Sequence, residues 1–380
     1  MRILYDHQAF QMQYFGGVSK SFCELISCLP KEQVEVQISI VQSNNVHLRA
    51  SGLLPDLRPV SMDHKMWNER HPGKLMDVLY LAANRFLPLQ TADSLNRRAT
   101  FEALRSQDFD VFHPTYYKPE VLKYVGKKPF VMTIHDMMPE LYPEYFSRNS
   151  VDVVGKRLMA ERASHIVAVS QNTKEDAIRI LGLPEEKITV IHHGGPEKAS
   201  VKGQRIVEGR YFLYVGQRIA YKRFPDMLKS FAAVASREDM MDIRFVCTGQ
   251  PFNVEEERLI ASLNLKDRVL HCRPSDADML DLYAGAVAFV YPSSYEGFGM
   301  PILEAFSAGC PCILYKASCF PEVADAAVYF EDDLSEKLVQ VANWKVDERN
   351  LWIQKGFERL EAYSWQKSAE KLVNVYKSVI

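Results

Sequence analysis

Short apolar runs recur along the chain, and longer amphipathic stretches separate them. In the first half the apolar runs are RILYDH, VEVQISIV, FDVFH, PFVMTIHD, HIVAVS and KITVIHHG. Between them lie stretches with helical periodicity, such as SKSFCELISCL and VDVVGKRLMAERAS. Apolar runs of this length that alternate with amphipathic stretches are typical of parallel strands joined by helical crossovers. The pattern therefore predicts a doubly wound α/β fold with a parallel, Rossmann-like sheet.

The segment HHGGPEKASVKGQRIVEGR, residues 192–210, interrupts this rhythm with glycine, proline and charged residues. After it the alternation restarts with YFLYVG, DIRFVCTG, DRVLHC, AVAFVYPS, PCILY and AVYF. We therefore predict two α/β domains that face a central cleft, at residues 1–195 and 211–360, joined by a linker at residues 196–210. Ligands bind at the carboxyl ends of the strands in open parallel sheets, so the loops after the strands are where chemistry is expected.

The composition is that of a globular protein and argues against several classes. The 380 residues are 47% hydrophobic and 25% charged, and the net charge of −2 provides no overall attraction for nucleic acid. The first residues, MRILYDHQAF, lack the apolar stretch of a signal peptide, and no run is long enough to span a bilayer. The seven cysteines include no C-x-x-C pair, which favours buried thiols in a reducing cytoplasm over disulfides or a zinc site.

Basic residues outnumber acidic ones between His64 and Lys128. They are Lys65, Arg70, Lys74, Arg85, Arg97, Arg98, Lys118, Lys123, Lys127 and Lys128. A solvated surface is the preferred interpretation of such a stretch. The alternative is a patch that faces anionic lipid or a lipid-phosphate substrate at the inner face of the cytoplasmic membrane.

The segment YPSSYEGFGMPILEAFSAGCPCI, residues 291–313, carries two glutamates around glycine, phenylalanine and proline. Pro301 suits a first helical turn and Gly309 suits a helix C-terminus, so a strand, a loop and a helix are expected. Glu296 then lies in the loop, and Glu304 in the first turn of the helix.

This strand–loop–helix suits a sugar nucleotide. Backbone N–H groups around Phe298, Gly299 and Met300 would point out of the helix N-terminus, where they can receive a phosphate. Carboxylates accept hydrogen bonds from sugar hydroxyls, and glycine permits close approach of the backbone. The combination fits a sugar nucleotide better than a bare nucleotide.

The segment resembles the Glu-x7-Glu signature of the retaining glycosyltransferases of family four, which have the two-domain GT-B fold. The resemblance covers nearly the whole chain. It extends over YDHQAFQMQYFGGVSKSF, TIHDMMPELYP, AVSQNTKEDAI, YVGQRIAYKRF and CFPEVADAAVYF. It implies that residues 1–195 form the acceptor-side domain and residues 211–360 bind the nucleotide sugar. Residues 361–380 would form a last helix that packs back on the first domain; a helix lying on a membrane surface is the alternative.

The resemblance also implies roles for the matching residues. Glu304 would hold the ribose, and Glu296 and His135 would lie beside the transferred sugar. Arg218 and Lys222 match the basic pair that neutralises the departing diphosphate. The chain has Arg223 where the family usually has asparagine, so whether Arg223 also binds the diphosphate stays open. The remaining donor contacts implied by the resemblance are Gly16, Gly17, Gly297, Phe298, Gly299, Met300 and Pro301.

The implied reaction transfers a hexose with retention, and the leaving phosphate helps to take the acceptor's proton. No cofactor and no metal are expected, because the strings DFD (Asp108, Asp110) and DAD (Asp276, Asp278) are interpreted as solvated caps. The combination of YDHQAF, YFGGVS and YVGQRIAYK looks most similar to bacterial mannosyltransferases of surface-polysaccharide assembly (O-antigen, capsule or lipopolysaccharide). GDP-mannose is therefore the expected donor, a UDP-hexose the next choice, and a lipid-diphosphate-linked sugar the expected acceptor.

Two other functions stay open on the same pattern. A sugar-nucleotide epimerase would use a similar cleft but would not need the Glu-x7-Glu signature together with the basic pair. A binding protein with a degenerate site would not retain Arg218, Lys222, Glu296 and Glu304. A hydride-transferring dehydrogenase lacks support, since no G-x-G-x-x-G follows the first strand.

Overall fold

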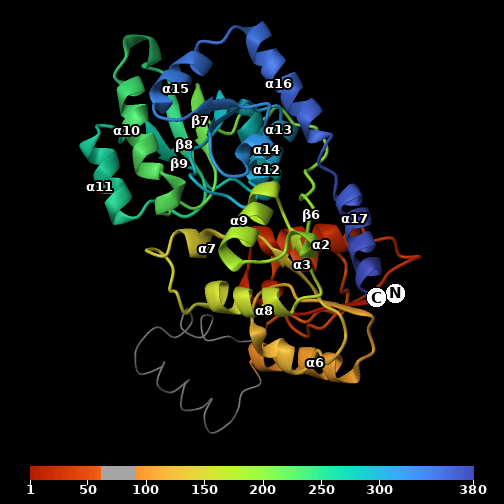
Figure 1. The fold of residues 1–380 in the computed structure, drawn as a ribbon. Helices are drawn as coiled ribbons and strands as arrows, with labels where there is room; N and C mark the ends of the chain where they lie inside the picture. The colour runs from red at the N-terminus through yellow and green to blue at the C-terminus, as the bar shows by residue number, and fades with distance from the viewer. Residues whose placement is uncertain (61–90) are drawn as a thin grey trace. The chain divides into compact units, whose positions relative to one another are not determined.

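Each apolar run of the first half contains a β-strand in the computed structural model, which describes residues 1–60 and 91–380 (Figure 1). The strands form two three-stranded parallel sheets with the orders β2-β1-β3 and β4-β5-β6. Their bounds are β1 Arg2–Tyr5, β2 Glu35–Ile38, β3 Val111–His113, β4 Val131–Ile134, β5 His165–Ala168 and β6 Ile188–Val190. A single parallel bridge between Phe112 and Phe130 connects β3 to the start of β4.

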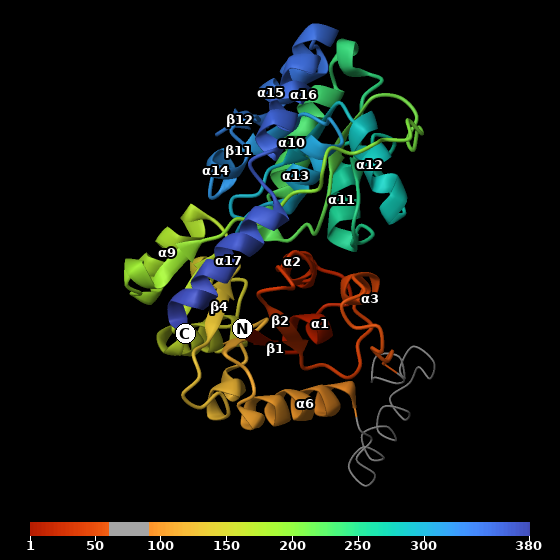
Figure 2. The same cartoon turned by 90° about the vertical axis from the view of Figure 1, so that its right-hand side faces the viewer.

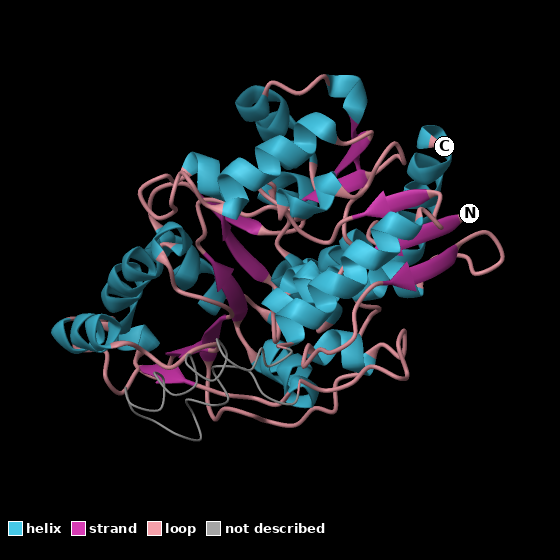
Figure 3. Cartoon of the chain, turned by 90° about the horizontal axis from the view of Figure 1, so that it is seen from below, coloured by secondary structure: helices cyan, strands magenta, loops and turns pink. Residues whose placement is uncertain are grey.

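The apolar runs of the second half form one six-stranded parallel sheet (Figure 3). The strands are β7 Tyr211–Tyr214, β8 Arg244–Cys247, β9 Val269–His271, β10 Ala288–Tyr291, β11 Cys312–Tyr315 and β12 Val328–Phe330. Their order, β12-β11-β10-β7-β8-β9, reverses direction between β7 and β10. At such a switch point the loops that follow the two strands diverge and leave a crevice for ligands.

Helices connect the strands as the amphipathic stretches predict. The first half contains α1 Gln8–Met12, α2 Gly17–Ser27, α3 Val46–Ala50, α6 Ala92–Ser106, α7 Met138–Leu141, α8 Lys156–Arg162 and α9 Gln171–Leu181. The second contains α10 Phe224–Ala235, α11 Val254–Ser262, α12 Asp276–Gly285, α13 Met300–Ser307, α14 Phe320–Val323, α15 Leu334–Ala342, α16 Val346–Leu360 and α17 Trp365–Val379. Helix α10 packs on α11 and α15, whereas α13 packs on α12 and α16, so two helical layers cover the six-stranded sheet.

The contacts divide the chain into two units whose boundaries differ from the predicted ones. The first unit comprises residues 1–169, 174–191 and 365–380, and the second comprises residues 170–173 and 192–364. The segment 196–210, expected as a linker, is grouped with the second unit. The reason is local packing: the Ala199 N–H donates to the carbonyl of Ser307 at 2.9 Å, and the Gly203 N–H donates to Asp281 at 2.9 Å.

The last helix, α17, packs against α2 in the first unit (Figure 2). The buried Tyr376 hydroxyl lies 2.6 Å from the hydroxyl of Tyr5 and 2.6 Å from Nδ1 of His113. Nε2 of His113 in turn lies 2.9 Å from the Thr133 hydroxyl. Burial lowers the pKa of His113 to about 3, so the ring is neutral and the network carries no buried charge. In the described part of the chain, no helix is both long enough and apolar enough to cross a membrane.

Candidate active site

The loops after β7 and β10 meet at the switch point of the second unit. Lys222 ends the short 3₁₀ turn Ala220–Lys222, and its ammonium donates hydrogen bonds to Oε1 of Glu296 and, at 3.2 Å, to the hydroxyl of Tyr291. Only 10% of the Lys222 side chain and 15% of the Glu296 side chain are exposed. The two loops are also joined through Ser294, whose N–H and hydroxyl both donate to the carbonyl of Tyr221. The structure therefore brings Lys222 and Glu296 together.

The loop from Glu296 to α13 is fixed by its backbone. Gly299 has a φ of 86°, a conformation that favours glycine, and a Cβ there would lie in tight contact with Ile302 at 3.0 Å and Phe320 at 3.2 Å. Pro301 lies in the first turn, as predicted. The Ser318 hydroxyl donates to the Glu296 carbonyl at 2.6 Å and accepts from the Glu296 N–H at 3.2 Å.

Phe298 anchors the same loop through its side chain. The ring is 4% exposed and packs against His192, His193 and Tyr363, with ring centroids 6.0, 5.1 and 5.6 Å away. His192 and His193, which follow β6, are therefore packing partners of the loop. Only the backbone of Phe298 is thus available to a ligand of the second unit.

Glu304 is the fifth residue of α13 and lies directly after the first turn, where it was predicted. The helix begins at Met300, and its first turn contains no acidic residue. The hydroxyl of Tyr283 donates to Oε2 of Glu304 at 3.4 Å. Burial, followed by the nearby carboxylate, raises the pKa of Tyr283 well above its usual value, so the hydroxyl stays a donor. The Tyr283 hydroxyl therefore helps to orient the half-buried carboxylate of Glu304.

Arg218 is held by hydrogen bonds along most of its guanidinium. Its guanidinium donates to Oε1 of Glu256 at 2.9 Å and to the carbonyls of Thr248, Gln250 and Pro251 at 3.2, 2.5 and 2.9 Å. These contacts use four of the five N–H groups of an arginine. The side chain is 4% exposed. The contact of Arg218 with the diphosphate, which the family resemblance implies, stays a prediction.

His135, Gly16 and Gly17 belong to the first unit, whereas the other candidate residues belong to the second. His135 directly follows β4; its N–H donates to the Tyr117 hydroxyl at 3.0 Å, and its ring meets Phe22 edge to face at 5.7 Å. Burial, the neighbouring His113 and the charge of Lys156 lower the pKa of His135 to about 3, so its imidazole is neutral.

Asp136 and the two glycines are placed by local backbone contacts. Oδ1 of Asp136 accepts from the Met138 N–H at 3.1 Å, which is a turn contact at the start of α7. Gly16 precedes α2 and Gly17 begins it. A Cβ on Gly16 would lie 2.4 Å from Oε1 of Gln13, the oxygen that accepts the Ser19 N–H at 3.0 Å.

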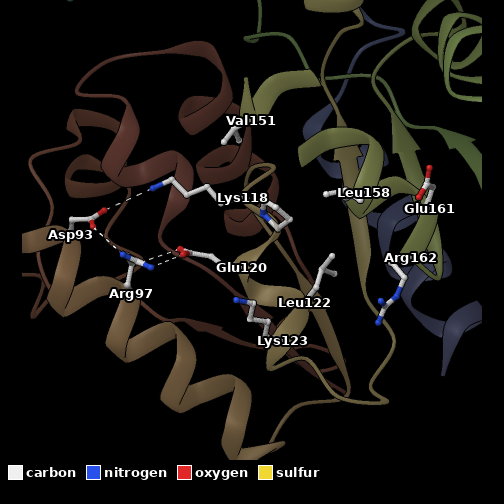
Figure 4. Close-up of a pocket in the computed structure, with 11 residues that line it drawn as sticks. Asp93, Arg97, Lys118, Glu120, Leu122, Lys123, Val151, Leu158, Glu161 and Arg162 are labelled. Carbon is white, nitrogen blue, oxygen red and sulfur yellow. Dashed lines mark hydrogen bonds and ion pairs between the residues drawn. The ribbon is translucent and has the colours of Figure 1, made fainter. Parts of the chain in front are cut away.

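A hollow of about 860 Å³ lies in the first unit, between α6 and α8 (Figure 4). None of the candidate residues lines it. Its charged side chains are largely paired with one another: Arg97 with Glu120 at 2.6 Å, and Lys118 with Asp93 at 3.8 Å. We therefore do not assign the active site to this hollow. Within residues 1–60 and 91–380 no cluster of three or more metal-ligating side chains is found.

Sequence reasoning did not identify three partners of the candidate residues: Tyr291, Tyr283 and Glu256. Tyr291 ends a buried strand and Tyr283 lies in α12, so both look like core residues. Glu256 is part of the string NVEEE, in which Asn253 and Glu256 form a capping box at the start of α11. That spacing predicts a helix start and gives no indication of a partner for Arg218.

Comparison with known proteins identifies the family and the fold. Residues 15–195 match the family described as Glycosyltransferase Family 4, and residues 197–356 match the family described as Glycosyl transferases group 1. The chain is 28% identical to the O-antigen chain mannosyltransferase B of Escherichia coli over 311 residues, 74% of this chain and 78% of that protein. It is 29% identical to the O-antigen chain mannosyltransferase RfbU of Salmonella typhimurium over 205 residues. The latter match spans 53% of this chain and 56% of RfbU.

Other relatives have different names. A D-inositol 3-phosphate glycosyltransferase of Thermobispora bispora is 26% identical over 278 residues, 64% of each chain. Among solved structures, Anabaena HepE in complex with UDP and glucose superposes with a TM-score of 0.71 over the full length of both chains, at 16% identity. The two family matches together cover nearly all of the described units. The chain therefore belongs to the family-four glycosyltransferases and has their GT-B fold of two Rossmann-like domains.

Proposed function

We propose that this chain is a retaining hexosyltransferase that moves mannose from GDP-mannose to a lipid-linked saccharide precursor of a bacterial surface polysaccharide. The relatives named O-antigen mannosyltransferases support the choice of sugar. The observation that carries the proposal is the pair of Lys222 and Glu296 at the switch point between β7 and β10. It places a cation and a carboxylate on neighbouring loops at the edge where ligands of parallel sheets bind.

The reaction separates a nucleoside diphosphate from a sugar, so negative charge grows on the diphosphate as the bond breaks. Lys222 would meet this charge, because its ammonium is already aimed by Tyr291 and Glu296 and is nearly buried. The N-terminus of α13, shaped by Gly299, would add backbone N–H groups and its dipole. The leaving phosphate would take the proton of the acceptor hydroxyl, so no separate general base is assigned.

Glu304 is assigned to the ribose. We expect Glu304→Ala to weaken binding of both GDP-mannose and free GDP by about tenfold or more, since a hydrogen bond to a charged group contributes about 1.5–3 kcal/mol. Calorimetry with the purified variant measures this, and Glu336→Ala in α15, which leaves the loops after β7 and β10 untouched, is the matched control. Unchanged affinity for GDP in Glu304→Ala would contradict the assignment.

The choice of donor is tested by a hydrolysis and transfer panel across GDP- and UDP-sugars. GDP-mannose is expected to be turned over fastest. Preference for a UDP-hexose would keep the transferase assignment and change the donor. Conversion of the donor alone into an epimerised sugar nucleotide would instead support an epimerase on the same fold.

The acceptor proposal includes peripheral contact with the cytoplasmic membrane. Of the basic residues between His64 and Lys128, those at positions 65, 70, 74 and 85 lie outside the described residues. In the described part, Arg97 pairs with Glu120 and Arg98 pairs with Glu102 at 2.7 Å. These pairs favour a solvated surface for this part of the stretch, so this patch does not support a lipid-linked acceptor. The two relatives are named for the O-antigen chain, and the lipid link is part of our proposal.

A further inference from the structure

A lysine is buried in the first unit, close to the loop that carries His135. Lys156 begins α8, and only 1% of its side chain is exposed. Its ammonium donates to Oε2 of Glu140 in α7 and to the carbonyl of Asp136, both at 2.9 Å. Because Asp136 directly follows His135, this contact fixes the backbone on one side of the histidine. A buried ammonium group is costly unless it is paired, and Glu140 supplies the counter-charge.

The same ammonium supports the other side of His135 through Tyr117. It lies 5.4 Å from the centroid of the Tyr117 ring, a position in which a cation is attracted to the face of an aromatic ring. The hydroxyl of this buried tyrosine accepts the His135 N–H at 3.0 Å. One buried charge therefore holds the backbone on both sides of His135.

The backbone that precedes Lys156 brings the start of α8 close to Tyr117. Residues Val151–Gly155 form one π-helical turn, a rare conformation that is frequent at functional sites. A Cβ on Gly155 would lie 2.3 Å from the carbonyl oxygen of Tyr117, so a larger residue would push α8 away from this tyrosine. The first residue of α8 is therefore seated directly against Tyr117.

The pair of Lys156 and Glu140 is a poor way to stabilise a fold. Within residues 1–60 and 91–380, the buried Oε1 of Glu140 accepts no hydrogen bond. A buried acceptor without a donor lowers stability, and apolar residues of similar volume often stabilise a fold as well as a buried ion pair does. Apolar residues could not replace the contacts that the ammonium makes beside His135.

We propose that Lys156 and Glu140 form a positioning pair, which holds the His135 loop, residues 135–138, in the geometry that sugar transfer requires. This rests on the proposed function, in which His135 lies beside the transferred sugar. Lys156 acts through the backbone on both sides of the histidine and does not touch the donor. A displacement of about 1 Å at a reacting group can lower the rate about a hundredfold, so a rigid support matters at this position.

Three variants separate positioning from stability. K156M removes the ammonium and keeps an unbranched, flexible side chain. K156M/E140L replaces both partners with apolar residues, so no unpaired carboxylate stays buried and the fold should keep nearly wild-type stability. K187M is the matched control, because Lys187 also donates to two backbone carbonyls of the first unit. These are the carbonyls of Ala160 and Glu161, both at 2.9 Å, in the second half of α8.

The test combines thermal unfolding, amide hydrogen exchange of the His135 loop, steady-state transfer from GDP-mannose and calorimetry with GDP. K156M and K156M/E140L are both expected to speed exchange of the His135 N–H. Both should lower kcat about tenfold to a hundredfold and leave the affinity for GDP unchanged. H135A/K156M should be about as slow as H135A, since Lys156 acts through the histidine. K187M should keep wild-type exchange in the loop and wild-type kcat.

Three results would overturn the proposal. The first is K156M with wild-type exchange in the His135 loop. The second is faster exchange in K156M together with wild-type kcat. The third is K156M/E140L with both stability and kcat at wild-type values, which would mean that the pair serves only the fold. A wild-type chain that transfers no sugar contradicts the proposed function instead, and the exchange measurement still tests whether Lys156 holds the loop.

Discussion

Replacement of Lys222 by alanine is expected to lower kcat/KM for GDP-mannose by about two to three orders of magnitude. That is the loss typical of removing one preorganised group that stabilises transition-state charge. The substitution also leaves Glu296 and the Tyr291 hydroxyl without the ammonium that now lies between them. The remaining carboxylate would then repel the departing diphosphate, which adds to the loss. Steady-state transfer assays measure the effect.

Two further variants separate the effect of the charge from a general effect on the second unit. Lys222→Arg keeps the charge and is expected to retain more activity than the alanine variant. Lys229→Ala is a control in α10 of the same unit, because Lys229 is 63% exposed and pairs only loosely with Asp226 at 3.7 Å. It should behave as wild type. A Lys222→Ala protein within about tenfold of wild type would contradict the assignment of the diphosphate to this lysine.

Replacement of His135 by alanine is expected to reduce kcat about a hundredfold and to leave the affinity for GDP unchanged. A loss of this size is typical of removing one hydrogen-bonding group at the reacting sugar. The reason is that His135 is assigned to the transferred sugar and Glu304 to the ribose. Because the folded-state pKa of His135 lies at about 3, its ring is neutral throughout the pH range 5–8. The pH profile of kcat should therefore show no loss from this group as the pH falls from 8 to 5.

The control for this variant is His165→Ala. His165 begins β5, at the opposite end of a strand from the ligand-binding edge, and bonds the Thr189 hydroxyl at 2.8 Å. It should leave kcat near wild type. An equal loss of free GDP affinity in His135→Ala would show instead that the histidine supports the fold or the nucleotide site.

The strands could be predicted because each one is a short apolar run between helical stretches, and the parallel order follows from that alternation. The Glu-x7-Glu segment could be placed for the same reason. Pro301 and the left-handed Gly299 and Gly309 mark the start and end of one helix, and this fixes Glu296 in the loop before it. The meeting of Lys222 with Glu296 then follows from the neighbouring positions of β7 and β10.

The features that could not be predicted depend on contacts between residues distant in the sequence. Nothing in QRIAYK shows that the Arg218 guanidinium turns toward the loop after β8, since exposed and buried arginines share the same local pattern. The grouping of residues 196–210 with the second unit could not be predicted, because glycine, proline and charge indicate a loop without showing which unit it packs on. Glu304 lies just past the first turn because the helix begins at Met300, and helix starts are uncertain by one or two residues from sequence.

The anomeric configuration of the product tests the central claim most directly. Purified protein, GDP-mannose and a synthetic lipid-diphosphate-linked sugar would be incubated with and without an excess of chelator, and the product linkage read by NMR. The account predicts a mannosylated product that keeps the α-configuration of the donor, formed at similar rates in both conditions because Lys222 and the α13 N-terminus meet the diphosphate charge. An inverted linkage would contradict retaining transfer, and activity that is lost with chelator and restored by a divalent ion would contradict the assignment of charge to these groups.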